Sequence, residues 1–127
     1  MPDLVDEARK ARKNAVDPVS KFKVGAALRT AEGKVYRGCN VENCTYGLTV
    51  CAERVALLTA LAAGERKFTA IAVVTQSEEP STPCGPCRQL MWEYCGDIEV
   101  TLANLAGQRV EYKLSTLFPH PFSFCID

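Results

Sequence analysis

The chain has 127 residues, of which 47% are hydrophobic and 24% are charged, a composition typical of one globular domain with a single core. Lysine plus arginine and aspartate plus glutamate number 15 each, which argues against a polynucleotide or an anionic membrane as partner. The charged N-terminus lacks the apolar stretch of a signal peptide, and no run approaches the roughly 18 apolar residues that would span a bilayer. We therefore expect a single domain over residues 1–127, in the cytoplasm, with its seven cysteines reduced.

Helices and strands alternate along the predicted structure. Leucine, valine and alanine at helical spacing predict a first amphipathic helix, and β-branched apolar runs predict strands. In chain order, the predicted elements are a helix over residues 4–16, a β-hairpin over 23–30 and 35–41, a helix over 49–64, a strand over 68–76, a helix over 84–96, and strands over 97–104 and 109–114. This order predicts an α/β fold with three layers, in which a five-stranded mixed sheet lies between helices on both faces.

The two central helices carry signals at their ends. Thr49 is a candidate N-cap of the first of them, and Gly64 is a candidate for its end. Pro86 falls in the first turn of the second. Both helices flank the strand over 68–76, so we expect their N-termini to meet at one end of the sheet, where α/β folds build their sites.

Three cysteines stand at these two helix starts. Cys84 and Cys87 form a C-x-x-C motif, and Cys51 lies 33 residues before Cys84. A helix N-terminus lowers the pKa of a thiol, and thiolates bind Zn²⁺ well. Three protein ligands with an open fourth position are typical of catalytic zinc, whereas structural zinc is closed by four ligands. The sequence therefore predicts one Zn²⁺ per chain with an open position.

The residues after the ligands suggest how such a site would work. Glu53 follows Cys51 by two residues, so its carboxylate can face the open side of the metal and take a proton from bound water. Three thiolates give the site a net negative charge, which makes that water less acidic. We expect Arg54, Arg88 or both to hydrogen-bond the sulfurs and offset this charge, with Gln89 as a further candidate.

Other interpretations of the cysteines stay open at this point. A C-x-x-C motif can be a redox pair. A closed structural zinc site would need a fourth ligand, for which the candidates are Cys39, Cys44, Cys95 and His120. None of these has a second ligand pair at the spacing of zinc ribbons. The cysteines outside the motif, Cys125 included, are otherwise expected to be small apolar side chains.

Four segments carry motifs that occur together in one enzyme family. They are SKFKVGAAL (20–28), GCNVENCTYGLTVCAERVAL (38–57), TPCGPCRQ (82–89) and LFPHPF (117–122). In order and spacing they resemble the cytidine deaminases, in the small three-cysteine form. The resemblance implies a five-stranded mixed sheet, a homotetramer, and zinc-dependent hydrolysis of cytidine and deoxycytidine to uridine and deoxyuridine with release of ammonia, as in pyrimidine salvage.

The resemblance also implies roles for residues around the metal. Cys51, Cys84 and Cys87 would bind zinc, and the zinc-activated water would attack the ring carbon that bears the amino group. Glu53 would carry a proton from water to the ring nitrogen and then to the departing ammonia. The backbone of Ala52 would help to fix the base.

Further residues are implied in binding the nucleoside and in assembly. Asn40 and Glu42 would hydrogen-bond a sugar hydroxyl, and Phe22 would stack on the pyrimidine. Phe122 would reach into the pocket of a neighbouring subunit, so that active sites lie at subunit interfaces. Tyr46 would line an adjacent interface.

The chain departs from the family pattern near these residues, and two other functions stay open. Lys23 stands where proline is frequent, Cys44 where alanine is usual, and Thr82 where serine is frequent. These departures bear on substrate preference and subunit contacts rather than on the zinc ligands.

The alternative functions are a deaminase of another aminopyrimidine nucleoside, such as blasticidin S, and a non-catalytic zinc-binding module. The intact NVEN segment favours a plain nucleoside.

Overall fold

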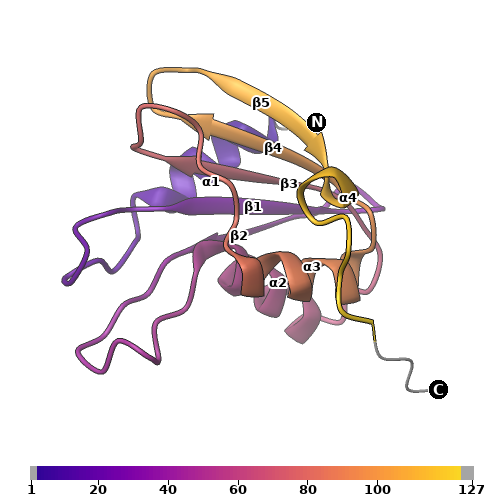
Figure 1. Cartoon of the computed structure of the whole chain (residues 1–127), viewed down its shortest axis with the longest axis horizontal. Coiled ribbons are helices and arrows are strands. Elements are labelled where there is room, and N and C mark those ends of the chain that lie inside the picture. Colours follow the sequence, from indigo (N-terminus) through magenta and orange to yellow (C-terminus); the bar gives the residue numbers. More distant parts are fainter. Residues whose placement is uncertain (1–2, 124–127) are drawn as a thin grey trace.

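A computed structural model describes residues 3–123 of the chain, and Figure 1 shows one sheet with helices on both of its sides. The helices are α1 (Leu4–Arg12), α2 (Ala52–Ala62), α3 (Gly85–Cys95) and α4 (Leu114–Leu117). The strands are β1 (Gly25–Thr30), β2 (Val35–Cys39), β3 (Phe68–Thr75), β4 (Glu99–Asn104) and β5 (Arg109–Lys113). No helix among the described residues is both long enough and apolar enough to cross a membrane.

The strands form one mixed sheet in the order β2-β1-β3-β4-β5. β1 pairs antiparallel with β2 and β3, β3 pairs parallel with β4, and β4 pairs antiparallel with β5. The parallel pair needs a crossover, which α3 provides, so β3, α3 and β4 form a βαβ unit. α1 packs on one face and α2 and α3 pack on the other (Figure 1), which confirms the predicted three-layer α/β/α fold.

Both faces of the sheet are buried, and β3 contributes to each. The cluster beneath α1 comprises Leu4, Val5, Ala8, Ala27, Ala72, Val74 and Ala103. On the other face, Ile71 and Val73 pack with Ala56 and Leu57 of α2 and with Met91 of α3. A strand that is buried on both faces needs apolar side chains at every position, which explains the continuous apolar run of β3.

Two glycines allow helices to lie directly against strands. A Cβ atom on Gly38 would lie 2.4 Å from the carbonyl oxygen of Ala52 and 2.4 Å from the amide nitrogen of Ala56. A Cβ atom on Gly25 would lie 2.6 Å from the amide nitrogen of Arg12. The first contact brings the start of α2 onto β2, and the second brings the end of α1 onto β1.

The first helix is shorter than predicted. It ends at Arg12 rather than at residue 16, because the chain turns toward the sheet after the helix. The Val16 N–H donates to the carbonyl oxygen of Asn40 over 2.9 Å, and Val16 forms an isolated bridge with Val41. The segment that follows α1 is therefore held beside the end of β2.

The helix starts on the other face also differ from the prediction. The N-cap residue of α2 is Cys51, not Thr49, so the predicted cap is wrong. The N-cap residue of α3 is Cys84. The predicted helix ends are confirmed, since Gly64 and Gly96 follow the last helical turns with φ of 94° and 73°, values that favour glycine.

Candidate metal centre and adjoining pocket

Two helix starts place three sulfur atoms together. Cys51 and Cys84 are N-cap residues with extended backbone angles, and Cys87 is buried in the first turn of α3. The three sulfurs lie within 4.8 Å of one another, with 3.8 Å between Cys51 and Cys84 and 3.1 Å between Cys84 and Cys87. A redox pair would leave the third sulfur unexplained, whereas a metal ion accounts for all three.

The cluster fits a zinc ion. Two thiolates at about 2.3 Å from a tetrahedral Zn²⁺ lie about 3.8 Å apart, which matches the separation of 3.8 Å between the Cys51 and Cys84 sulfurs. The Cys84 and Cys87 sulfurs are closer and would move apart to hold the ion. Residues 3–123 add no fourth ligand to the group. The candidates for a closed site that stay outside the group are Cys39, Cys44, Cys95 and His120, and Cys125 lies outside the described residues.

The thiols of the cluster differ in acidity. A hydrogen bond with Cys87 and the nearby guanidinium of Arg54 lower the pKa of Cys51 to about 5. The same hydrogen bond, together with burial, raises the pKa of Cys87. The Cys51 sulfur is thus stabilised as a thiolate, whereas a bound cation would favour the thiolate form of Cys87.

Arg54 makes the predicted contact with a ligand sulfur. Its Nη2 donates to the Sγ of Cys51 over 3.5 Å and to the carbonyl oxygen of Thr49 over 3.3 Å. The hydrogen bond to Cys51 and the negative charge of the sulfurs raise the pKa of Arg54. The guanidinium therefore offsets part of the charge that three thiolates bring to the site.

Arg88 and Gln89 make their described hydrogen bonds elsewhere, so Arg54 is the one of the three candidates with a described hydrogen bond to a sulfur. Arg88 donates to the carbonyl oxygens of Pro83 (2.7 Å) and Leu117 (2.9 Å). The Gln89 side chain donates to the carbonyl oxygen of Phe122 over 2.8 Å and accepts from its N–H over 3.2 Å. Gln89 is two residues after Cys87 and does not share its face of the helix. Arg88 is four residues after Cys84, and its guanidinium bonds the carbonyl oxygens of Pro83 and Leu117 instead.

Glu53 lies in the first turn of α2 and is 5% exposed. Burial, reinforced by the negative charge of Cys51, raises the pKa of its carboxyl to about 7. A carboxyl with a pKa near neutrality can both accept and release a proton. The residue lines the same pocket as Cys51, so an acid–base group and a metal ligand face one space.

The pocket has a volume of about 300 Å³. Four predicted substrate-binding residues line it together with Cys51 and Glu53, namely Phe22, Asn40, Glu42 and Ala52. The sequence predicts no substrate-binding role for its other lining residues, which are Ser20, Val24, Thr49, Val73, Thr75, Ser81 and Thr82. Most of these are small hydroxyl or apolar residues from separate segments, so only the fold brings them together.

Asn40 holds the backbone from Phe22 to Val24. Its side chain is buried, its Nδ2 donates to the carbonyl oxygen of Phe22 over 2.9 Å, and its Oδ1 accepts from the N–H of Val24 over 2.8 Å. A primary amide has two N–H donors and two lone pairs. The second N–H of Nδ2 donates to the Oε2 of Glu42 over 3.5 Å, so one lone pair of Oδ1 remains for a ligand in the pocket.

Glu42 caps the loop that precedes Phe22. Its Oε1 accepts from the N–H groups of Val19 (3.1 Å) and Ser20 (2.9 Å), and its Oε2 accepts from the Ser20 hydroxyl. Hydrogen bonds from the Ser20 hydroxyl and amide hold the pKa of Glu42 below its usual value. The residue therefore presents an ionised, fixed acceptor at the pocket.

Tyr46 and Phe122 lie outside the pocket of their own chain. Their residues are 67% and 68% exposed. Tyr46 has a φ of 58° and lies in the loop between β2 and α2, which extends away from the sheet (Figure 1). Their positions leave both rings available to another subunit, a role that stays a prediction.

Comparisons with known proteins agree with a zinc site formed by the three sulfurs. Residues 2–103 match the family model described as the cytidine and deoxycytidylate deaminase zinc-binding region. The chain is 50% identical to a cytidine deaminase of Halalkalibacterium halodurans, over 94% of this chain and 92% of that protein. It is 48% identical to a cytidine deaminase of Sporosarcina psychrophila, over 94% and 89%. A blasticidin-S deaminase of Bacillus cereus is 34% identical over 79% of this chain and 76% of that protein.

The fold agrees with the sequence matches. The crystal structure of cytidine deaminase from Burkholderia pseudomallei matches with a TM-score of 0.90 and 51% identity, covering 94% of this chain and 96% of that one. The three-sulfur cluster lies within the region that the family model covers. The chain belongs to the cytidine and deoxycytidylate deaminase family.

Proposed function

We propose that the protein deaminates cytidine and deoxycytidine by hydrolysis, with release of ammonia. The observation that carries this proposal is the placement of buried Glu53 and the sulfur ligand Cys51 on one pocket of nucleoside size. A metal site with three protein ligands and a neighbouring acid–base group is the layout of hydrolytic zinc enzymes. Family membership agrees with this chemistry.

The chemistry divides between the metal and Glu53. Zn²⁺ held by Cys51, Cys84 and Cys87 would supply a Lewis acid that makes a water molecule more acidic. Glu53 would take a proton from that water and give it to the ring nitrogen. The water oxygen would bond to the ring carbon, and Glu53 would move the second proton of the water from that oxygen to the amino nitrogen. The bond from the carbon to this nitrogen would then break, which releases ammonia and leaves a carbonyl group.

The remaining pocket residues would bind the two parts of the nucleoside. Phe22 would stack on the pyrimidine, and the backbone of Ala52 would hydrogen-bond the base. Glu42 is ionised and fixed, and the Nδ2 of Asn40 donates to it over 3.5 Å. A sugar hydroxyl would enter between the two side chains, accepting from Asn40 and donating to Glu42. This sugar site favours an unmodified nucleoside over a blasticidin-type antibiotic.

The exposed aromatic rings support assembly into a homotetramer. Tyr46, Leu48 and Phe122 are each at least two-thirds exposed, which is unusual for large apolar residues. Gln89 fixes the backbone of Phe122 through two hydrogen bonds, so its ring projects in a defined direction. We propose that this ring enters a neighbouring subunit's pocket and that Tyr46 lines an adjacent interface.

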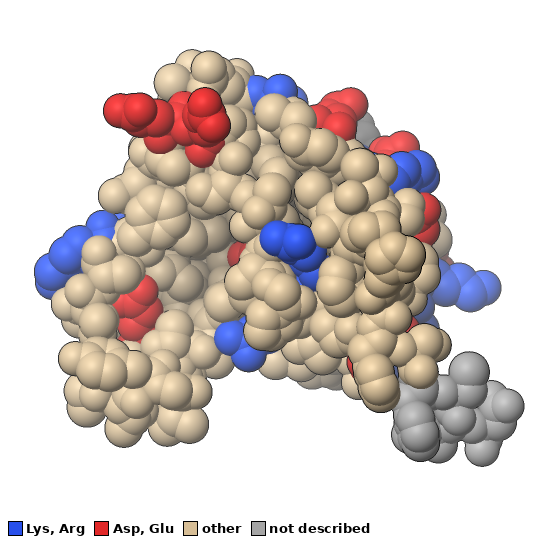
Figure 2. All heavy atoms as spheres, in the orientation of Figure 1, with Lys and Arg blue, Asp and Glu red and all other residues tan. Residues whose placement is uncertain are grey.

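The charge distribution favours a small substrate over a polynucleotide. Figure 2 shows that the Lys and Arg residues of the described part on this face stand apart and form no continuous track. Binding to nucleic acid depends on such a track along the phosphates. We further propose a reducing compartment such as the cytoplasm, because a site of three thiols needs its cysteines reduced.

Ammonia release from the zinc-loaded protein tests the proposed function. Cytidine, deoxycytidine and blasticidin S are each supplied at several concentrations, and the Glu53→Gln variant serves as the control. We expect release from the two nucleosides, and we expect it to stop when a chelator removes the metal. Release from blasticidin S alone would show that the antibiotic, rather than the two nucleosides, is the substrate. No release from any of the three would point to a non-catalytic zinc module.

A further inference from the structure

We propose that Arg12 and Gln76 are positioning residues for substrate binding, because together they hold the backbone on both sides of Phe22 from outside the pocket. The inference rests on the proposed function and deepens it. Phe22 is the expected stacking partner of the pyrimidine. The position of its ring depends on the position of its backbone. Neither Arg12 nor Gln76 belongs to the motifs that identify the family.

The contacts form a connected set. The Nε of Arg12 donates to the carbonyl oxygen of Lys23 over 3.1 Å, and its Nη2 donates to the Oε1 of Gln76 over 2.8 Å. The Nε2 of Gln76 in turn donates to the carbonyl oxygen of Lys21 over 3.4 Å. The two carbonyl groups that receive these hydrogen bonds belong to Lys21 and Lys23, the residues immediately before and after Phe22.

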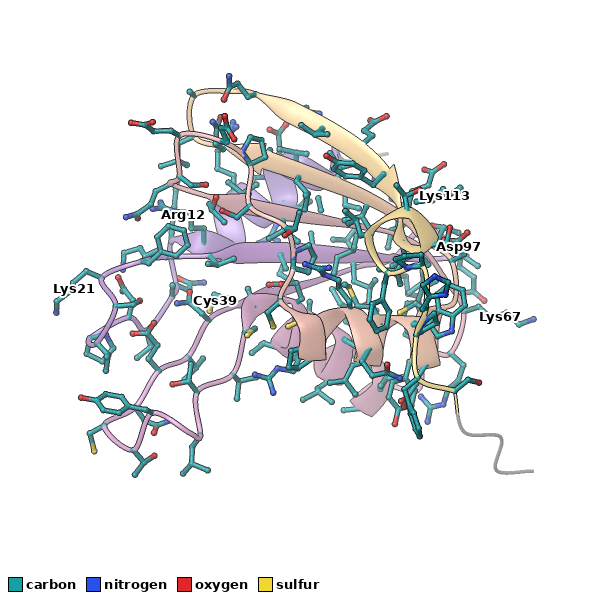
Figure 3. The ribbon with its side chains drawn as sticks, in the orientation of Figure 1. Arg12, Lys21, Cys39, Lys67, Asp97 and Lys113 are labelled. Carbon is teal, nitrogen blue, oxygen red and sulfur yellow. The ribbon has the colours of Figure 1, made fainter. Side chains whose placement is uncertain are left out.

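Arg12 reaches this segment from the other layer of the fold. It is the last residue of α1, which packs on the face of the sheet opposite α2 and α3. Gly25 permits the approach, because a side chain there would lie 2.6 Å from the Arg12 amide nitrogen. Figure 3 shows Arg12 at the end of the sheet where the loop with Lys21 extends. Neither Arg12 nor Gln76 lines the pocket.

The segment needs support because its own conformation is unfavourable. Lys21 has a φ of 58°, in the left-handed region that non-glycine residues rarely adopt. Inside the pocket, Asn40 and Glu42 hold residues 19–24. Outside it, Arg12 and Gln76 hold the same stretch, so the stacking residue lies between two sets of hydrogen bonds. Removal of the outer set takes the hydrogen bonds from the carbonyl groups of Lys21 and Lys23 and leaves the strained segment with those from Asn40 and Glu42 and the local ones with Asp17 and Ser20.

The expected consequence is a loss of substrate affinity without a loss of metal. The described hydrogen bonds of Arg12 and Gln76 do not involve the sulfurs or Glu53. A segment with more conformations binds the base less well, since only the fraction in the binding conformation is competent. We therefore expect KM to rise while kcat and zinc content change little.

Steady-state kinetics with cytidine test the proposal in the zinc-loaded enzyme. We expect Arg12→Ala and Gln76→Ala each to raise KM about tenfold with kcat within about twofold, a change that corresponds to the loss of one or two hydrogen bonds. The effect of the double variant on KM should be smaller than the two single effects combined, because each single variant already breaks the hydrogen bond between Arg12 and Gln76. Gln76→Glu keeps the acceptor for Arg12 but loses the donor to the Lys21 carbonyl oxygen, so its KM should lie between those of the wild type and Gln76→Ala. Arg9→Ala, on the same helix, is the control and should match the wild type.

Hydrogen exchange provides a second readout that does not depend on turnover. The amides of residues 19–24 should exchange faster in Gln76→Ala than in the wild type, whereas those of α2 and α3 should not change. Gln76 is exposed, so this variant should fold even if Arg12→Ala does not. If exchange in residues 19–24 stays at the wild-type rate, or if KM is unchanged, the positioning role is wrong. Should the wild type release no ammonia, the exchange result alone decides the inference.

Discussion

The two helices that carry the sulfur ligands begin alike but are held differently. The start of α2 lies against β2, where Gly38 leaves no room for a side chain, and both Ala52 and Glu53 are buried. The start of α3 is open, with exposed Cys84 and no atom within 4 Å of a Cβ built on Gly85. Hydrogen bonds from Arg88 hold this second start to the surrounding backbone. Backbone packing thus fixes one half of the site, and side-chain hydrogen bonds fix the other.

The difference matches what each half has to do. The α2 half holds Glu53, whose carboxyl must keep its place relative to the reacting atoms, and close packing provides that constraint. The α3 half contributes two of the three sulfurs, and a bound metal itself restricts their positions.

Replacement of Glu53 should have the largest effect on activity. Without a proton carrier, we expect Glu53→Gln to retain zinc and lose about 10²–10⁴-fold in kcat, the range for general acid–base groups. Ammonia release and metal content on the same preparation measure both quantities. Glu111→Gln, which changes an exposed carboxylate on β5, is the control. Turnover at the wild-type rate would remove Glu53 from the proposed mechanism.

An added methyl group should lower stability at Gly38, which lies on β2 against the start of α2, but not at Gly85, which lies at the start of α3. Gly38→Ala must displace the backbone of Ala52 and Ala56, and we expect it to cost about 1–3 kcal/mol of stability and to weaken zinc binding. Gly85→Ala places its methyl group in open space and should leave stability unchanged or slightly higher. Denaturant unfolding of the two variants compares them directly. Equal losses would show that the two starts are held alike.

Replacement of Arg54 should mainly weaken metal binding, whereas replacement of Arg88 should mainly lower stability. We expect Arg54→Ala to weaken zinc affinity about 10–100-fold, because it removes a hydrogen bond to the Cys51 sulfur. Arg88→Ala removes two hydrogen bonds to backbone carbonyls and should lower stability by about 1–3 kcal/mol with a smaller effect on the metal. Competition with a chelating dye and thermal unfolding measure the two effects. The reverse pattern would overturn the assignment of Arg54 as the charge-offsetting residue.

The sequence predicts most of the fold and the centre of the site. Helical and strand periodicity is sufficient for the order of elements, and the apolar run of β3 reflects burial on both faces. The spacing of Cys51, Cys84 and Cys87 at two helix starts is sufficient for the metal cluster. Arg54 follows the same logic, since it is three residues after a ligand and shares its face of the helix.

Contacts between residues far apart in the chain could not be predicted in this way. Gln89 is close to the ligands in sequence, yet it bonds Phe122, which is 33 residues further on. Arg12 and Gln76 are 64 residues apart and belong to no motif, so only the fold reveals that they meet. Side-chain direction and tertiary packing decide such contacts, and local sequence carries little information about either.

X-ray absorption spectroscopy at the zinc edge tests the central claim most directly. The claim is that three sulfurs hold the ion and that its fourth position is open to water beside Glu53. For the zinc-loaded protein we predict three sulfur neighbours at about 2.3 Å and one oxygen or nitrogen neighbour at about 2.0 Å. Four sulfur neighbours would show a closed, structural site and would contradict both the open position and the hydrolytic function built on it.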